Sequence, residues 1–220
     1  MKEQGRKSLR RGFLLLLLFA LWTALVCSVD VQTVEQTGTE VGFATVNFRF
    51  HELTGVHMGL YTITDWLGLV PLSVCIGFGI IGAAQLITRR SLIKVDRDII
   101  LLGVYYIIVM AGYIIFEMIP VNYRPVLIEG RLEASYPSST TLLVLGVMPT
   151  LAFQAERRMK CDKCRKLVMM FSYGFSVFMV AGRLVSGVHW LTDIVGSVLL
   201  STGLFCIYRS AVILYSKDGK

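Results

Sequence analysis

The residues Arg183, His189 and Asp193 have types and a spacing suited to attack on a phosphate group. His189 and Asp193 are four residues apart, so on a helix their side chains share one face. A carboxylate there can hold one ring nitrogen of the histidine and leave the other free as a nucleophile or base. The guanidinium of Arg183 can donate paired hydrogen bonds to phosphate oxygens and stabilise the charge of the transition state. Together the three residues predict phosphoryl-transfer chemistry.

A second polar stretch lies earlier in the chain, between two apolar segments. Its residues that can bind or protonate a substrate are Glu117, Arg124, Arg131, Glu133, Tyr136, Ser138, Ser139 and Thr140. We expect Ser138 and Ser139 to open a helix, where free backbone N–H groups can receive an anion.

Both stretches resemble the motifs of the type 2 phosphatidic acid phosphatases, membrane and soluble phosphatases related to vanadium haloperoxidases. The pattern of that family is KxxxxxxRP, PSGH and SRxxxxxHxxxD. The residues of this chain that match it are Arg124 and Pro125, Pro137 and Ser138, and Arg183, His189 and Asp193.

The resemblance implies a site without a metal or other cofactor. In it, His189 forms a phosphohistidine intermediate and Asp193 orients the imidazole. The residues that we expect to bind the substrate are Arg124, Arg183, Ser138, Ser139, Arg131 and Tyr136.

The chain departs from the family pattern at several motif positions. Glu117 stands where the family has Lys, Ser139 where it has Gly, and Gly182 where it has Ser. Thr140 replaces the His that protonates the leaving alcohol. A threonine hydroxyl is too weak an acid for this role, and loss of a general acid typically lowers the rate about 10²–10⁴-fold.

Three interpretations fit these departures. In the first, Glu117 or Glu133 is held protonated and donates the proton, while Arg131 replaces the lysine. In the second, the substrate is an ester with a good leaving group, such as a diphosphate. In the third, the protein is a catalytically weakened or inactive relative that binds lipid phosphate head groups. Retention of His189 with Asp193 favours the first two.

The composition places these residues in a membrane protein. Apolar residues make up 55% of the 220 residues and charged residues 17%, which excludes a disordered chain, a coiled coil and a disulfide-stapled secreted module. A transmembrane helix needs about 20 apolar residues. The segments that approach this length are 12–29, 66–88, 99–119, 139–155, 167–182 and 190–212.

The basic residues indicate how the segments are oriented. Of the 22 Lys and Arg residues, all but Arg49, Arg124, Arg131 and Arg183 lie in the termini and in the loops 89–98 and 156–166. Short cytoplasmic loops retain such charge, so we expect both termini in the cytoplasm and the site on the outer side. Topology thus explains the net charge of +7, and we expect no nucleic-acid partner.

We therefore expect an all-α protein with a six-helix transmembrane bundle, in the plasma or cytoplasmic membrane of a bacterium. The expected parts are a basic N-terminus with an uncleaved first helix (1–29), an outer loop with an interfacial helix (30–65), a phosphatase-like core (66–212) and a cytoplasmic tail (213–220). The expected partners are membrane lipids and a phosphorylated lipid or polyprenyl substrate. The charges gather at one surface instead of at mid-membrane depth, which disfavours a transporter.

The cysteines suggest no metal site and no disulfide framework. Cys161 and Cys164 form a CxxC in the most basic loop, but the three histidines lie on the other side of the predicted membrane. Structural zinc needs four ligands, so this pair by itself is not a zinc site.

Overall fold

The computed structural model describes residues 2–215. Over this range the chain is almost entirely helical, with one short two-stranded hairpin. In chain order the elements are α1 (Lys2–Val26), β1 (Gln32–Thr33), β2 (Glu40–Val41), α2 (Ala44–Thr54), α3 (Met58–Leu67), α4 (Leu69–Arg89), the 3-10 helix η1 (Leu92–Lys94), α5 (Arg97–Met118), α6 (Ser139–Arg158), α7 (Asp162–Val185) and α8 (Leu191–Tyr215). The prediction of an all-α fold is confirmed.

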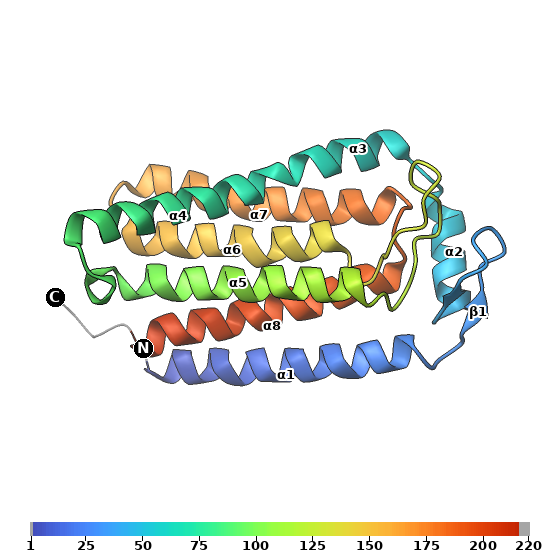
Figure 1. Ribbon diagram of the computed structural model, residues 1–220, viewed down its shortest axis with the longest axis horizontal. Helices are drawn as coiled ribbons and strands as arrows, with labels where there is room; N and C mark the ends of the chain where they lie inside the picture. Colours follow the sequence, from blue (N-terminus) through green and yellow to red (C-terminus); the bar gives the residue numbers. More distant parts are fainter. Residues whose placement is uncertain (1, 216–220) are drawn as a thin grey trace.

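The long helices lie roughly side by side and form a bundle (Figure 1). Five stretches are long and apolar enough to cross a membrane: Lys2–Val26, Met58–Arg89, Arg97–Met118, Asp162–Val185 and Leu191–Tyr215. They correspond to five of the six predicted spans, and the chain is an integral membrane protein. The predicted span 139–155 is helical as part of α6, but α6 is not among the five.

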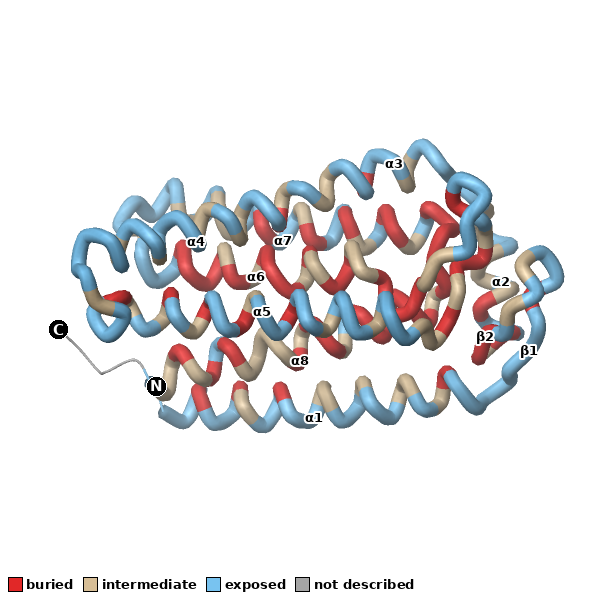
Figure 2. The backbone as a smooth tube through the Cα atoms, viewed as in Figure 1, coloured by how far each residue is buried: buried red, intermediate tan, exposed pale blue. Residues whose placement is uncertain are grey.

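The helix α6 falls outside the five because its side chains are more polar, and it can be polar because other helices enclose it. It packs against α4, α5, α7 and α8, and much of its length is buried (Figure 2). Neighbouring helices hydrogen-bond its polar groups: Tyr106 shares a hydrogen bond of 2.7 Å with Thr150, and Gln154 donates one of 2.8 Å to Tyr208. An enclosed helix needs no continuous apolar surface, since its neighbours and not lipid surround it.

The outer segment 30–65 differs from the single interfacial helix that we expected. It contains the hairpin, α2 and most of α3, and the chain turns between the two helices at Gly55, whose φ is +66°. The helix α3 then continues past Gly68 into α4, so that Met58–Arg89 forms one long apolar stretch. The helical pattern predicted there was correct in type, but its second half extends the second span.

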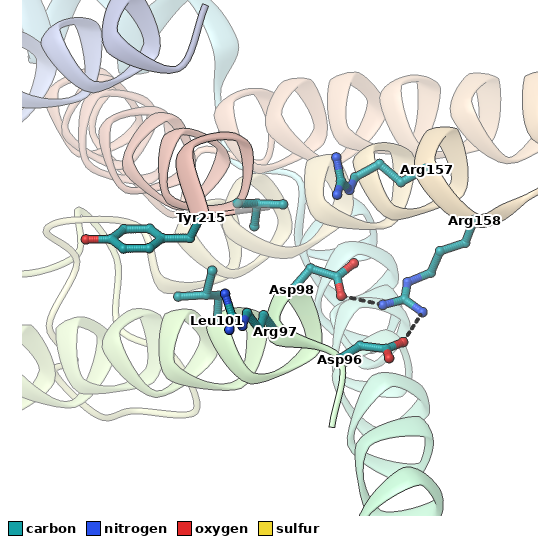
Figure 3. A pocket seen from close by; sticks show the side chains of 8 residues that line it. Asp96, Arg97, Asp98, Leu101, Arg157, Arg158 and Tyr215 are labelled. Atoms are coloured by element: carbon teal, nitrogen blue, oxygen red, sulfur yellow. Dashed lines mark hydrogen bonds and ion pairs between the residues drawn. The ribbon is translucent and has the colours of Figure 1, made fainter. Parts of the chain in front are cut away.

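The bundle has two different ends. One end, here called the terminal end, holds the N-terminus of α1, the C-terminus of α8 and the turns 90–96 and 159–161 (Figure 1). There Arg158 donates hydrogen bonds of 3.1 Å to Asp96 and 2.7 Å to Asp98 (Figure 3). Asp96 also accepts one of 2.8 Å from Arg89. These ion pairs join α4, α5 and α6 beside a cavity of about 440 Å³.

The opposite end, here called the site end, holds α2, the hairpin, the α5–α6 loop (119–138) and the α7–α8 turn (186–190) (Figure 1). Both polar stretches singled out in the sequence lie there. The fold therefore brings them to one end of the bundle.

Candidate functional site

The α7–α8 turn places His189 directly at the start of α8. The helix α7 ends at Val185, and Gly187 then adopts a φ of +70°. A Cβ atom on Gly187 would lie 2.0 Å from the carbonyl oxygen of Gly55. Only glycine allows this approach, in which the α2–α3 turn packs directly on the turn that carries His189. The backbone N–H of His57 also donates a 2.9 Å hydrogen bond to the carbonyl of Ser186.

His189 is buried between an arginine and a carboxylate. Its Nε2 lies 3.4 Å from Nη2 of Arg183, and its Nδ1 lies 3.7 Å from Oδ2 of Asp193. Burial, together with the positive charges of Arg183 and Arg124, holds the pKa of His189 well below its ordinary value. A guanidinium can only donate, so Nε2 faces Arg183 with its lone pair. The imidazole is therefore neutral near neutral pH and carries its proton on Nδ1, toward Asp193.

Asp193 is fully buried and held by two further donors. The backbone N–H of Trp190 donates to its Oδ2 at 2.9 Å, and Nδ2 of Asn122 donates to its Oδ1 at 3.2 Å. A buried carboxylate needs such partners, because leaving its oxygens unpaired would be costly. These bonds fix the carboxylate at the Nδ1 side of His189.

Two arginines from different elements converge above one aromatic ring. The guanidinium of Arg183 lies 4.9 Å from the centre of the Tyr61 ring, and that of Arg124 lies 5.5 Å from it. Arg124 also forms an ion pair of 3.1 Å with Glu133, and Nη1 of Arg183 lies 3.7 Å from Oδ1 of Asp65. The structure thus brings the predicted pair of arginines together on a platform supplied by α3.

Both arginines keep buried donors that no group in the described residues accepts. These are Nε and Nη1 of Arg124 and Nε and Nη1 of Arg183. Arg183 is 1% exposed and Arg124 is 6% exposed. Buried polar groups in proteins are nearly always hydrogen-bonded, so a cluster of unsatisfied cationic donors points to an anion as its partner.

The start of α6 lies beside this cluster. The N–H of Ser138 points to the carbonyl of Asp193 at 3.4 Å, and its buried hydroxyl has no partner. Ser139 and Thr140 line a mainly apolar cavity of about 310 Å³ between α4, α5 and α6. Asp65 and Tyr113 line the same cavity.

The other predicted site residues lie apart from this cluster. Glu117 is exposed in the last turn of α5 and lines a small cavity with Ser139 and Tyr136. Arg131 is exposed in a tight turn of the α5–α6 loop, opposite Ile128. None of the described contacts joins either side chain to His189 or to the two converging arginines.

Tyr136 of the α5–α6 loop faces α1 instead of the cluster of arginines. Its hydroxyl shares a 2.7 Å hydrogen bond with Thr23 of α1, and its ring stacks on Phe19. This residue connects α1 to the α5–α6 loop.

Sequence reasoning missed three residues: Tyr61, Asp65 and Asn122. Tyr61 and Asp65 belong to α3, which the sequence assigned to a separate outer loop. The spacing of the two residues, four apart on one helical face, was a visible signal. Nothing local to Asn122 marks it as a partner of Asp193.

No group of three or more His, Cys, Asp or Glu residues within positions 2–215 is placed to hold a metal ion.

Comparison with known proteins adds a family and a structural neighbour. The model of the PAP2 superfamily matches residues 115–213, which include the α5–α6 loop and the α7–α8 turn. The structure is similar to that of the first transmembrane PAP2-type phosphatidylglycerolphosphate phosphatase from Bacillus subtilis. The TM-score is 0.69 at 16% sequence identity, over 95% of this chain and 99% of that one. None of the curated proteins matches the chain.

Proposed function

We propose that the chain is a membrane phosphatase of the PAP2 superfamily, whose model matches residues 115–213, and that it hydrolyses a lipid phosphate or diphosphate through a phosphohistidine intermediate. One observation carries this proposal. The neutral Nε2 of His189 faces the same guanidinium, that of Arg183, whose buried donors lack partners. A nucleophile and an anion-binding group therefore meet at one point.

The two arginines bind the phosphate in this proposal. Arg124 and Arg183 supply the buried N–H donors, and the N–H groups of the first turn of α6 add to them. Tyr61 holds both guanidinium groups in place through its ring. Their charge stabilises the phosphoryl oxygens as the transition state forms.

His189 then attacks phosphorus with its Nε2 lone pair. The imidazole becomes positively charged as the P–N bond forms, and its Nδ1 proton faces Asp193 at 3.7 Å. Asp193 stabilises this charge and keeps the ring in its orientation, since Trp190 and Asn122 hold the carboxylate. Water hydrolyses the phosphohistidine in a second step.

The substrate is a lipid in this proposal because an apolar cavity adjoins the site. The cavity of about 310 Å³ begins at Ser139 and Thr140 and continues along Leu69, Leu72 and Met110, so it suits a hydrocarbon tail. The structural neighbour named above is a phosphatidylglycerolphosphate phosphatase, which supports a lipid phosphate as substrate.

We propose that α6 is the sixth span and that the site end faces the outer side. With 20 residues, α6 is about 30 Å long, which matches the hydrocarbon core of a bilayer. The basic loops 89–98 and 156–166 lie at the terminal end, and retention of such charge in the cytoplasm supports this orientation.

A second function has one observation in its favour. Thr140 lines the lipid cavity at the position where the resembling family has its acid, and its hydroxyl is a poor proton donor. A protein that binds a lipid phosphate without turnover would keep the arginines and still tolerate this threonine.

The deciding experiment measures phosphate release by the purified protein in detergent. The substrates are phosphatidate, phosphatidylglycerol phosphate and a polyprenyl diphosphate. We expect turnover by the wild-type protein and a loss of at least about 10³-fold in His189→Ala, because the nucleophile is removed. Glu52→Ala, a change at an exposed residue of α2 at the same end, is the control and should retain activity. Equal, background rates for wild type and His189→Ala would support the binding function instead.

A further inference from the structure

The proposed reaction needs a proton donor for the leaving alcohol, and the position of this donor is constrained. The alcohol oxygen joins the phosphate to the lipid, so it lies where the phosphate-binding arginines meet the apolar cavity. The donor must contact both regions at once. It must also lie on the far side of the phosphate from His189, because the nucleophile and the leaving group are roughly in line.

We propose that Asp65 is this proton donor, an inference that rests on the proposed function. Its Oδ1 lies 3.7 Å from Nη1 of Arg183, and the residue also lines the apolar cavity. His189 approaches the other terminal nitrogen of the same guanidinium, Nη2, at 3.4 Å. A phosphate bound to Arg183 would therefore lie close to both His189 and Asp65.

The other carboxylates at this end fit the requirement less well. Glu133 pairs with Arg124 at 3.1 Å and does not line the apolar cavity. Glu117 lines a different, smaller cavity and not the one that Asp65 lines. Thr140 lines the same cavity as Asp65 but has no acidic proton at neutral pH.

In this step one proton moves from Asp65 to the leaving alcohol. Nε2 of His189 forms a bond to phosphorus, and the P–O bond to the lipid alcohol breaks with its electron pair on oxygen. The protonated carboxyl of Asp65 gives its proton to that oxygen, so the alcohol leaves neutral and Asp65 becomes a carboxylate. The carboxylate then takes a proton from water as the water oxygen attacks phosphorus, and the electron pair of the P–N bond returns to Nε2.

Asp65 faces Arg183 of α7 at 3.7 Å and shares its cavity with Tyr113 of α5 and with Ser139 and Thr140 of α6. A bound phosphate would add a negative charge beside Asp65, and a lipid tail would exclude water from the cavity.

Two substrates that differ in their leaving group test the assignment. For phosphatidate, whose leaving alkoxide needs a proton, Asp65→Asn should lower kcat about 10²–10⁴-fold. For p-nitrophenyl phosphate, whose leaving group is stable as an anion, the loss should be less than about 10-fold, because no acid is needed. The second activity also shows that Asp65→Asn is folded. The matched control is Glu52→Gln, an exposed carboxylate on α2 that should leave both rates unchanged.

The pH profile and two further variants give an independent readout. If a carboxyl of this protein donates the proton, rates on phosphatidate should fall at high pH, and this alkaline limb should be absent in Asp65→Asn. Asp65→Glu should keep the limb. Adding Thr140→His to Asp65→Asn should restore at least about 10-fold of the lost rate, since the imidazole enters the same cavity.

Three outcomes separate the two proposals. Equal losses on both substrates in Asp65→Asn, or an unchanged alkaline limb, would overturn the role of Asp65 and leave the phosphatase proposal intact. A loss that depends on the leaving group in Glu117→Gln, but not in Asp65→Asn, would assign the proton to Glu117. Wild-type protein without activity on either substrate, indistinguishable from His189→Ala, would refute the phosphatase proposal and the inference together.

Discussion

The contact between Gly187 and Gly55 predicts that one added methyl group, on a residue that takes no part in the chemistry, strongly lowers turnover. In Gly187→Ala, the new Cβ would lie 2.0 Å from the carbonyl oxygen and 3.0 Å from the carbonyl carbon of Gly55. Real Cβ atoms do not approach backbone this closely, so one of the two turns must move by about 1 Å. The atoms that the new Cβ would meet belong to the backbone of Gly55, so no change of side-chain rotamer can relieve the clash.

The magnitude follows from the geometry. The φ of +70° at Gly187 is a left-handed conformation, which costs a non-glycine residue about 1–2 kcal/mol. The displacement also strains the hydrogen bond from His57 to Ser186, whose net contribution is about 0.5–1.5 kcal/mol. We therefore expect a loss of about 2–3 kcal/mol in local stability. His189 lies two residues further on, and a misplacement of about 1 Å at a reacting group can cost about 10²-fold in rate.

The assay combines phosphate release with thermal unfolding. We expect kcat/KM on phosphatidate to fall about 10²-fold in Gly187→Ala. Gly174→Ala is the matched control, because a Cβ at this exposed position of α7 meets no atom within 4 Å. An alanine in a helix interior is favoured over glycine by roughly 0.5–1 kcal/mol, so the control should be slightly more stable and equally active. Activity of Gly187→Ala within about threefold of wild type would refute the idea that the α2–α3 turn holds His189 in place.

Two further predictions concern the aromatic platform and the CxxC. Tyr61→Leu removes the ring beneath Arg124 and Arg183, and each of these cation–π contacts is worth about 0.5–2 kcal/mol. The KM for a lipid phosphate should therefore rise about tenfold in Tyr61→Leu, whereas in Tyr61→Phe, which keeps the ring, it should stay within about twofold of wild type. A similar KM in both variants would contradict the role of the ring as a platform. Hydrogen bonds from the side chain of Cys164 and then from its backbone N–H lower the pKa of the exposed Cys161, so its thiolate forms at lower pH. The rate at which iodoacetamide labels Cys161 should therefore rise with pH around a midpoint below the ordinary thiol value of about 8.5. Cys164→Ala should move that midpoint upward, and an unchanged midpoint would exclude the interaction.

The part of the site predicted well from the sequence is the part fixed by local geometry. The positions of Arg183, His189 and Asp193 relative to one another depend on one helix end, one turn and one helix start. A separation of four residues places two side chains on one face wherever a helix forms, whatever it packs against. The three residues accordingly lie together in the structure.

Nearness to Arg124 in the sequence did not predict which residues of the α5–α6 loop lie close to it in space. Arg131 and Tyr136 lie in the same loop as Arg124, but one is exposed in a turn and the other bonds to Thr23. A loop of irregular backbone carries no period from which the direction of a side chain can be predicted. Only the packing of the loop on α1 and α8 decided which of these residues lie beside Arg183 and His189.

The polar character of α6 shows the same limit at the level of a whole helix. Its composition made it one of the two least apolar spans of the six, and it is not among the five stretches that pass by length and hydropathy. In the structure it is polar because it is enclosed, with Thr150 and Gln154 bonded to neighbouring helices. A sequence pattern shows that a side chain is polar, but it does not show which neighbouring group forms a hydrogen bond with it.

The sequence by itself determined an all-α membrane protein and the local unit of Arg183, His189 and Asp193, because helix formation and spacing along one helix depend on neighbouring residues. Tertiary structure alone decided that Tyr61 and Asp65 of α3 join this unit. Their contacts with Arg183 bridge distant parts of the chain, and such contacts are set by how α3 and α7 pack, which no period in the sequence encodes.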